Sequence, residues 1–224
     1  MRGLFITFEG TEGTGKSTQL GLLADDLRAR GVRVLVSREP GGTAFGRTLR
    51  ALILDPASGT VAPWAELFLY LADRAQHARE VLEPALERGD WVLCDRFADA
   101  TVAYQGHGRG LDPAFIREAS TRAAGGLAPD LTLLLDIADV AVGVARARRR
   151  QEADGTAGVA DRFEQEDLGF HRRVLEGYRA LAQAEPGRIR TLAADLTPEG
   201  LHQLVLAEVA QVAGARWPAG GARP

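Results

Sequence analysis

A glycine-rich segment, Gly10–Ser17, lies between an apolar run and a helical pattern, and it limits this chain to a small set of folds. Its eight residues, GTEGTGKS, match the phosphate-binding pattern G-x-x-x-x-G-K-[ST] in the strand–helix context that the pattern requires. The glycines let backbone N–H groups turn toward phosphate oxygens, and the following helix adds the positive end of its dipole. We expect Lys16 to bridge the β- and γ-phosphates of ATP and Ser17 to ligate Mg²⁺. The sequence therefore predicts that the following residues bind ATP: Gly10, Thr11, Glu12, Gly13, Thr14, Gly15, Lys16, Ser17 and Thr18.

Short apolar runs indicate five strands, at Leu4–Phe8, Val32–Val36, Trp91–Asp95, Leu131–Asp136 and Ile189–Leu192. Helical patterns separate them, at Lys16–Arg30, Ala44–Leu54, Trp64–Arg88, Pro113–Ala124, Val140–Arg150, Gln165–Ala184 and Pro198–Val212. Unbroken rather than alternating hydrophobicity is typical of strands that are buried on both faces of a parallel sheet. The pattern predicts an α/β fold, a doubly wound five-stranded parallel sheet flanked by helices, with ligands at the carboxyl ends of the strands.

Composition narrows the class of protein. The chain has 224 residues, which suits a single domain, and we expect one over residues 1–212 with a disordered tail at 213–224. A net charge of −3 gives no attraction for nucleic acid or an anionic membrane, and no apolar run is long enough to cross a bilayer. The one cysteine, Cys94, cannot form an intrachain disulfide, so we expect a reducing compartment and a cytoplasmic location.

Five further motifs identify a family. Glu9–Gly13, Arg38–Thr43, Ala72–His77, Asp95-Arg96 and Ala103–Gly106 occur in this order, and together they resemble bacterial thymidylate kinase from about Leu4 to Val212. The resemblance implies a P-loop kinase with a lid, which transfers the γ-phosphoryl group of ATP to dTMP, giving dTDP and ADP in dTTP synthesis. It also implies a homodimer, for which the helices expected at Trp64–Arg88 and Pro113–Ala124 could supply a face.

The end of the third strand combines a carboxylate and a guanidinium. Asp95 can hold Mg²⁺ through water, and Asp136, at the end of another strand, is its rival. Arg96 can pair with two phosphate oxygens, and the resemblance places it on the dTMP phosphate. The alternative is a structural ion pair between Asp95 and Arg96.

The resemblance assigns further residues to the acceptor. Tyr70 and Arg74 share a helix face, where Tyr70 would stack on thymine and Arg74 would hydrogen-bond the base edge. Family members often have phenylalanine at the position of Tyr70, and an aromatic residue there can also belong to the core; Phe68 is the more typical core residue. Thr101 would contact the base, and Tyr104 would exclude a 2′-hydroxyl. The remaining residues of this acceptor set are Arg38, Pro40, Arg50 and Gln105, and Arg50 could equally be solvated.

Phosphoryl transfer needs positive charge on the equatorial oxygens, and the glycine-rich loop contains no arginine. An arginine cluster before the polar segment 151–160 matches the family class that carries this arginine in a lid, here about residues 146–163. Arg146 and Arg150 share a helix face and are the candidates, although cations also suit a solvated helix end. By resemblance, Glu12 lies near the 3′-hydroxyl or phosphate of the acceptor. We expect 151–160 to be mobile.

Two alternatives remain at this stage. Another P-loop nucleotide or deoxynucleoside kinase would share the fold, because fold alone does not determine the substrate. A P-loop switch or regulatory ATPase would share the loop, but it would hydrolyse ATP without phosphorylating a nucleotide.

Overall fold

The computed structural model describes residues 1–153 and 162–218, except for the side chains of residues 150 and 151. One five-stranded sheet has the order β2-β3-β1-β4-β5, and every neighbouring pair is parallel. The strands are Phe5–Glu9 (β1), Val34–Arg38 (β2), Trp91–Asp95 (β3), Leu131–Asp136 (β4) and Ile189–Ala193 (β5). The predicted doubly wound fold is confirmed. The strand order reverses beside β1, so the carboxyl end of β1 is the expected ligand site.

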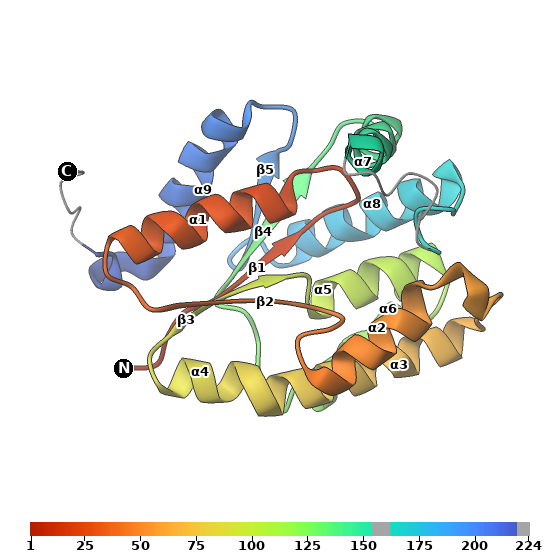
Figure 1. Cartoon of the computed structure of the whole chain (residues 1–224), viewed down its shortest axis with the longest axis horizontal. Coiled ribbons are helices and arrows are strands. Elements are labelled where there is room, and N and C mark those ends of the chain that lie inside the picture. Colours follow the sequence, from red (N-terminus) through yellow and green to blue (C-terminus); the bar gives the residue numbers. More distant parts are fainter. Residues whose placement is uncertain (154–161, 219–224) are drawn as a thin grey trace.

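Helices flank this sheet on both faces (Figure 1). They are α1 (Lys16–Ala29), α2 (Ala44–Leu54), α3 (Pro63–His77), α4 (Glu83–Glu87), α5 (Ala98–Thr101), α6 (Pro113–Ala123), α7 (Val140–Ala153), α8 (Leu168–Ala184) and α9 (Pro198–Ala213). Wider π-helical turns follow at Ala78–Leu82 and Val102–Gly108, and short 3₁₀ turns at Pro56–Ser58 and Gly214–Arg216. The sequence analysis missed the π-helical segment at Val102–Gly108.

Successive side chains of a strand point to opposite faces of the sheet, and this alternation shows which helices pack on each face. Ile6 and Phe8 of β1 pack with α1 and α9, whereas Phe5 packs with Leu82 and Leu86 around α4. On the second face, Leu134 of β4 also packs against α8. Helices α2, α3 and α6 lie together beyond this second face (Figure 1).

Among the element boundaries that differ from prediction, three have identifiable local reasons. Strand β2 begins at Val34 because the N–H of Val32 donates to the carbonyl of Leu27 and closes the end of α1. The single helix predicted over Trp64–Arg88 is divided by the π-helical turn at Ala78–Leu82, just before Pro84, which has no N–H to donate. Helix α8 begins at Leu168 because the side chain of Asp167 caps it.

The expected tail is partly ordered. Helix α9 continues to Ala213, a 3₁₀ turn follows, and the ring of Trp217 lies 6.5 Å from that of Trp91. The expectation of disorder is therefore wrong for residues 213–218, and residues 219–224 lie outside the described part of the chain. Within the described residues, none of the helices is both long and apolar enough for a membrane span.

Candidate active site

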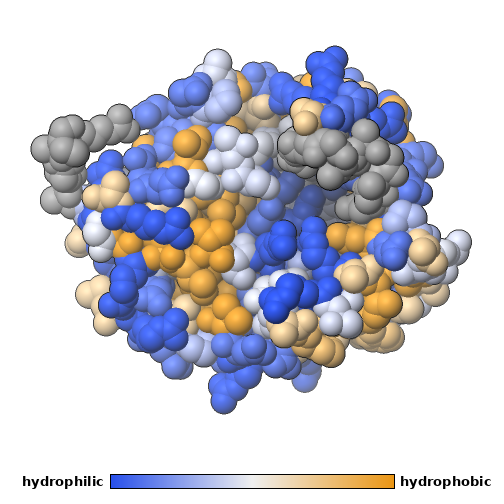
Figure 2. Space-filling model, in the orientation of Figure 1, coloured by the Kyte–Doolittle hydropathy of each residue, from blue (hydrophilic) through white to orange (hydrophobic). Residues whose placement is uncertain are grey.

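A cleft of about 270 Å³ opens at the carboxyl ends of β1, β2 and β3. Its lining includes Glu12, Gly13, Gly15, Lys16, Ser17, Arg38, Glu39, Pro40, Arg50, Leu54, Tyr70, Arg74, Asp95, Arg96, Phe97, Ala100, Thr101, Tyr104, Gln105, Phe163 and Glu164. Hydrophilic residues gather in the corresponding hollow of the surface, with apolar residues outside it toward α2 (Figure 2). The cleft brings together most of the residues that the sequence analysis assigned to ATP and to the acceptor. The remainder include Thr18, which is exposed on α1.

The backbone of the glycine-rich loop surrounds the side chain of Lys16. Lys16 is 8% exposed, and its Nζ donates to the carbonyls of Gly10 at 3.0 Å and Thr11 at 2.7 Å. Burial, with Arg96 nearby, lowers the pKa of Lys16 from 10.5 to about 8. Gly13 has φ 69°, and a Cβ there would overlap the carbonyl oxygen of Gly143, so only glycine allows this approach of the loop to α7. The loop thus holds an ammonium group at the start of α1.

A hydroxyl and a carboxylate meet beside the loop. Ser17 Oγ lies 3.3 Å from Asp95 Oδ2, and Asp95 Oδ1 is buried without a hydrogen-bond partner. Oxygen donors of this kind suit Mg²⁺, which also takes phosphate oxygens and water. The residues present therefore fit a magnesium ion. Asp136, the rival carboxylate, is paired with Arg179 at 3.1 Å.

Arg96 is held in an unusual backbone conformation. Its φ is 69°, the one left-handed non-glycine conformation among the described residues. Its Nη1 donates to the carbonyl of Gly10 and to Tyr178 Oη, each at 3.0 Å, and its Nη2 donates to Glu12 Oε1 at 3.2 Å. The guanidinium also lies 4.8 Å from the ring centre of Tyr104. The ion pair of Arg96 is therefore with Glu12 of the phosphate loop, not with Asp95, and the guanidinium lies between this loop and Tyr104 on the acceptor side.

Glu12 is surrounded by donors. Tyr104 Oη donates to its Oε1 at 2.5 Å, and His171 Nδ1 lies 3.3 Å from its Oε2. Burial disfavours the charged carboxylate, but His171, Arg96, Lys16 and Tyr104 together hold the pKa of Glu12 well below its usual range. Glu12 stays charged at the mouth of the phosphate loop. Sequence reasoning missed His171, which is 0% exposed.

Two more residues behind Arg96 were missed, Glu9 and Tyr178. Glu9 is fully buried and accepts from the backbone N–H of Phe97 and from Tyr178 Oη, both at 2.7 Å. Burial, reinforced by Asp99, raises the pKa of Glu9 from 4.5 to about 7. One buried carboxylate thus fixes the backbone next to Arg96 and the tyrosine that contacts its guanidinium.

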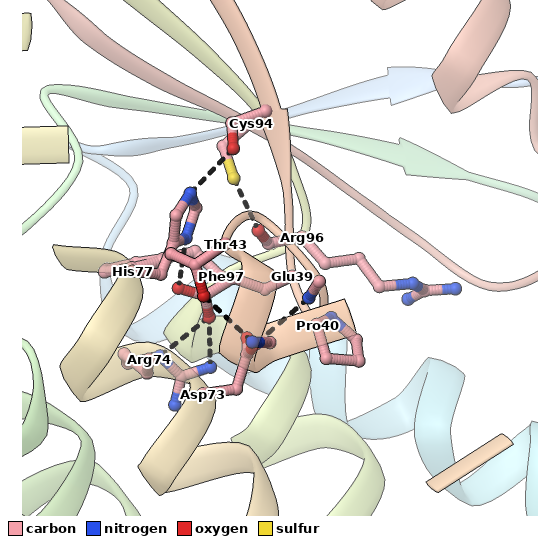
Figure 3. Close-up of polar contacts among 12 residues, drawn as sticks. Glu39, Pro40, Thr43, Asp73, Arg74, His77, Cys94, Arg96 and Phe97 are labelled. Atoms are coloured by element: carbon pink, nitrogen blue, oxygen red, sulfur yellow. Dashed lines mark hydrogen bonds and ion pairs between the residues drawn. The ribbon is translucent and has the colours of Figure 1, made fainter. Parts of the chain in front are cut away.

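A buried polar network supports the acceptor side (Figure 3). Arg74 is 1% exposed and donates from Nε to Glu39 at 3.0 Å and from Nη2 to Thr101 at 2.9 Å. His77 Nδ1 lies 3.0 Å from the other oxygen of Glu39, and Asp73 accepts from the N–H of Gly41 at 3.0 Å. The network joins α3 to the loop after β2, so the position of Arg74 in the cleft is fixed from behind.

The other predicted acceptor residues line the same wall. Arg38 is exposed at the end of β2, and Arg50 Nη1 donates to the carbonyl of Pro40 at 3.0 Å, so Arg50 is anchored in the structure. Thr101, Tyr104 and Gln105 come from α5 and the π-helical segment, and each is at least 94% buried.

The helix α3 shows which aromatic residue faces the cleft. Tyr70 is partly buried and lines it, with Phe163 at 6.3 Å between ring centres. Phe68 was expected in the core, and this is wrong: it is 56% exposed and packs against Trp64. Two residues along a helix turn a side chain by about 200°, which places Phe68 and Tyr70 on opposite faces. Phe163, buried in the cleft wall, was not predicted.

The two arginines predicted to act from the lid, Arg146 and Arg150, differ in what the structure describes of them. Arg146, on α7, donates to the carbonyl of Ala194 at 3.0 Å and is not among the residues that line the cleft. Helix α7 continues to Ala153, and the side chain of Arg150 and residues 154–161 lie outside what the structure describes, as does the predicted mobility there. Near the C-terminal end of the segment predicted as the lid, Arg162 donates a hydrogen bond to Glu66 at 2.6 Å.

Comparisons with known proteins agree with this geometry. Residues 8–205 match the family described as "Thymidylate kinase". The chain is 56% identical over 196 residues to the "Thymidylate kinase" of Desulfovibrio desulfuricans, covering 88% of this chain and 90% of the relative. It is 51% identical over 210 residues to that of Deinococcus radiodurans, covering 94% and 98%. The crystal structure of thymidylate kinase from Ehrlichia chaffeensis has a TM-score of 0.73 at 29% identity, covering 93% and 99%.

Proposed function

This chain belongs to the thymidylate kinase family, and we propose that the cleft described above carries out the family reaction with the residues assigned below. The protein transfers the γ-phosphoryl group of ATP to dTMP, giving dTDP and ADP. One observation supports this assignment best. Arg96 contacts both the phosphate loop, at Gly10 and Glu12, and the acceptor side, at Tyr104, within a single cleft.

On the donor side, the loop amides and Lys16 bind the β- and γ-phosphates, and Ser17 and Asp95 would hold Mg²⁺. When bound, that ion neutralises charge on the β- and γ-oxygens. On the acceptor side, Arg96 pairs with the phosphate of dTMP, with Arg38 and Arg50 beside it. An oxygen of that phosphate attacks the γ-phosphorus, and the bond to the β-phosphate oxygen breaks, so no covalent enzyme intermediate is required.

The nucleoside of dTMP fits the buried wall. Tyr70 stacks on the base, Arg74, Thr101 and Gln105 meet its polar edge, and the ring of Tyr104 occupies the space of a 2′-hydroxyl. Glu12, kept charged by its neighbours, orients Arg96 and Tyr104 toward the acceptor. The lid supplies the remaining positive charge. We assign that task to Arg150, since Arg146 is occupied by the carbonyl of Ala194.

An exposed aromatic surface supports the homodimer that we propose. Phe45 of α2, Trp64 and Phe68 of α3, and Phe115 of α6 are 50%, 46%, 56% and 42% exposed. Trp64 contacts both Phe68 and Phe115, so three of them form one continuous patch. A patch of large apolar side chains of this kind is typical of a protein interface. The free, buried thiol of Cys94 suits a reducing compartment, and we propose a cytoplasmic location.

An acceptor panel tests the function. ADP production is measured with ATP, Mg²⁺ and one acceptor at a time: dTMP, dUMP, dCMP, AMP or thymidine. The proposal requires dTMP to give the highest kcat/KM and thymidine to give no phosphorylated product. Equal ADP release with and without an acceptor would instead identify an ATPase, and preference for AMP or thymidine would identify another kinase.

A further inference from the structure

A fully buried carboxylate, Glu66, lies on the inner face of α3 behind the base side of the cleft. Its Oε1 accepts from Arg109 Nε at 3.2 Å and its Oε2 from Arg109 Nη2 at 3.3 Å. Arg162 Nη2 donates to Oε2 at 2.6 Å. The fourth donor is Gln105 Nε2, which lies 2.8 Å from Oε1. Glu66 therefore presents only acceptor atoms, and both of its oxygens are in use.

This arrangement fixes the orientation of the Gln105 amide. Hydrogen bonding decides which end of an amide faces a partner, and an acceptor-only carboxylate requires the NH₂ end. The carbonyl end of Gln105 is thereby turned away from Glu66. Gln105 is 1% exposed and lines the cleft, and its Oε1 is buried without a hydrogen-bond partner. A buried acceptor without a donor is unfavourable, so the site favours a ligand that brings an N–H group to this atom.

Pyrimidine bases differ at this edge. Thymine and uracil carry a donor N–H at ring position 3, whereas cytosine carries a lone pair there, which would face Gln105 Oε1 as a second acceptor. We propose that Glu66 is a specificity-determining positioning residue: by holding Nε2 of Gln105, it leaves Oε1 as an acceptor that selects thymine or uracil over cytosine. The inference rests on the proposed function, because it needs the base of the acceptor nucleotide to lie in this cleft.

The two arginines hold Glu66 in place from outside the cleft. Arg109 Nη1 also pairs with Glu166 at 2.6 Å, and Arg162 Nε donates to the carbonyl of Ile53 at 3.0 Å. Glu66 and Glu166 balance the two guanidinium charges. Among the described residues, neither arginine forms a hydrogen bond with Gln105. The contacts of Arg109 and Arg162 with Glu66 can therefore be weakened by substitution without reorienting the Gln105 amide.

Glu66→Gln tests the proposal. Two of the three arginine donors, Arg109 Nη2 and Arg162 Nη2, meet Oε2, so the new carbonyl oxygen takes that position. The new NH₂ group then takes the position of Oε1, where it loses the contact with Arg109 Nε, faces Gln105 and turns Nε2 of Gln105 toward the cleft. The ratio of kcat/KM for dTMP to that for dCMP is expected to fall about tenfold or more. The ratio for dTMP to dUMP should stay within about twofold, because both bases carry the same N–H, and KM for ATP should not change.

Arg109→Lys is the matched control, since it weakens the arginine contacts with Glu66 but keeps the Glu66 carboxylate. This variant should preserve the ratio of kcat/KM for dTMP to that for dCMP. If Glu66→Gln does not fold, as judged by circular dichroism, the charge-balanced Glu66→Gln/Arg109→Gln variant replaces it. An unchanged dTMP-to-dCMP ratio in a folded variant overturns the inference, as does an equal fall in the dTMP-to-dUMP ratio. A wild-type protein that does not phosphorylate dTMP would instead reject the proposed function.

Discussion

Replacing Glu9 with glutamine should change how the stability of this protein depends on pH. Glu9 is fully buried at the end of β1, where it accepts hydrogen bonds from Phe97 N–H and Tyr178 Oη. Burial is the largest influence on its pKa, followed by the negative charge of Asp99, and together they raise the pKa from 4.5 to about 7. Arg96 and the two hydrogen bonds lower the pKa, but only in part.

The sign and size follow from proton linkage. Between pH 4.5 and about 7, native Glu9 holds a proton that the unfolded chain has released. Its contribution to the free energy of unfolding is therefore complete below pH 4.5 and is lost as pH rises through about 7. At roughly 1.4 kcal/mol for each pKa unit, the loss is about 3 kcal/mol. Glutamine carries no charge, so the variant avoids this loss.

Urea unfolding of both proteins at intervals from pH 4.5 to 8 measures the effect. The free energy of unfolding of Glu9→Gln, minus that of the wild type, should rise by about 3 kcal/mol across this range. Subtraction removes the titrations that both proteins share. Glu118→Gln, on the solvent side of α6, is the matched control for loss of one carboxyl group. If the Glu9→Gln difference stays constant within about 1 kcal/mol, the raised pKa of Glu9 is refuted.

Five substitutions test the rest of the site and the proposed dimer surface. Lys16→Ala should reduce kcat at least about a hundredfold with little loss of stability, and near-normal turnover would exclude Lys16 from transfer. Tyr104→Ala should reduce the preference for dTMP over its ribonucleotide analogue, and an unchanged preference would contradict steric exclusion of the 2′-hydroxyl. Arg150→Ala should lower kcat more than Arg146→Ala, and normal turnover in both and in the double variant would remove the lid from the mechanism. Phe68→Glu should shift the protein to a monomer in light scattering, whereas a dimer of unchanged affinity would rule out the aromatic surface as the interface.

The phosphate loop could be predicted from local sequence. The whole cradle is contiguous, from Gly10 to Ser17, and its chemistry depends on glycine conformations and on one ammonium group rather than on distant partners. Unbroken apolar runs likewise predicted the five parallel strands. Burial on both faces explains the pattern in the inner strands β1, β3 and β4, whereas the edge strands β2 and β5 are partly exposed. Motifs near strand ends predicted that Asp95 and Arg96 lie in one cleft with the loop, and both line it, since parallel strands bring their carboxyl ends to one edge.

Helix periodicity predicted the positions of side chains less completely than the loop and strand patterns did. It separated Phe68 from Tyr70 but did not say which face of α3 points inward, and the core assignment of Phe68 was wrong. That choice depends on what packs against the helix. The same is true of Arg146, whose contact with Ala194 requires β5 and α7 to lie together.

Sequence alone determined the fold class, the glycine-rich loop and the family, because each is encoded by local patterns or by ordered motifs. Only the tertiary structure identified Glu9, Glu66, His171 and Tyr178 as partners of site residues. Each is a buried polar side chain whose partner lies at least 39 residues away in the chain. A buried charge is stable only beside the groups that compensate it, and folding decides which groups those are.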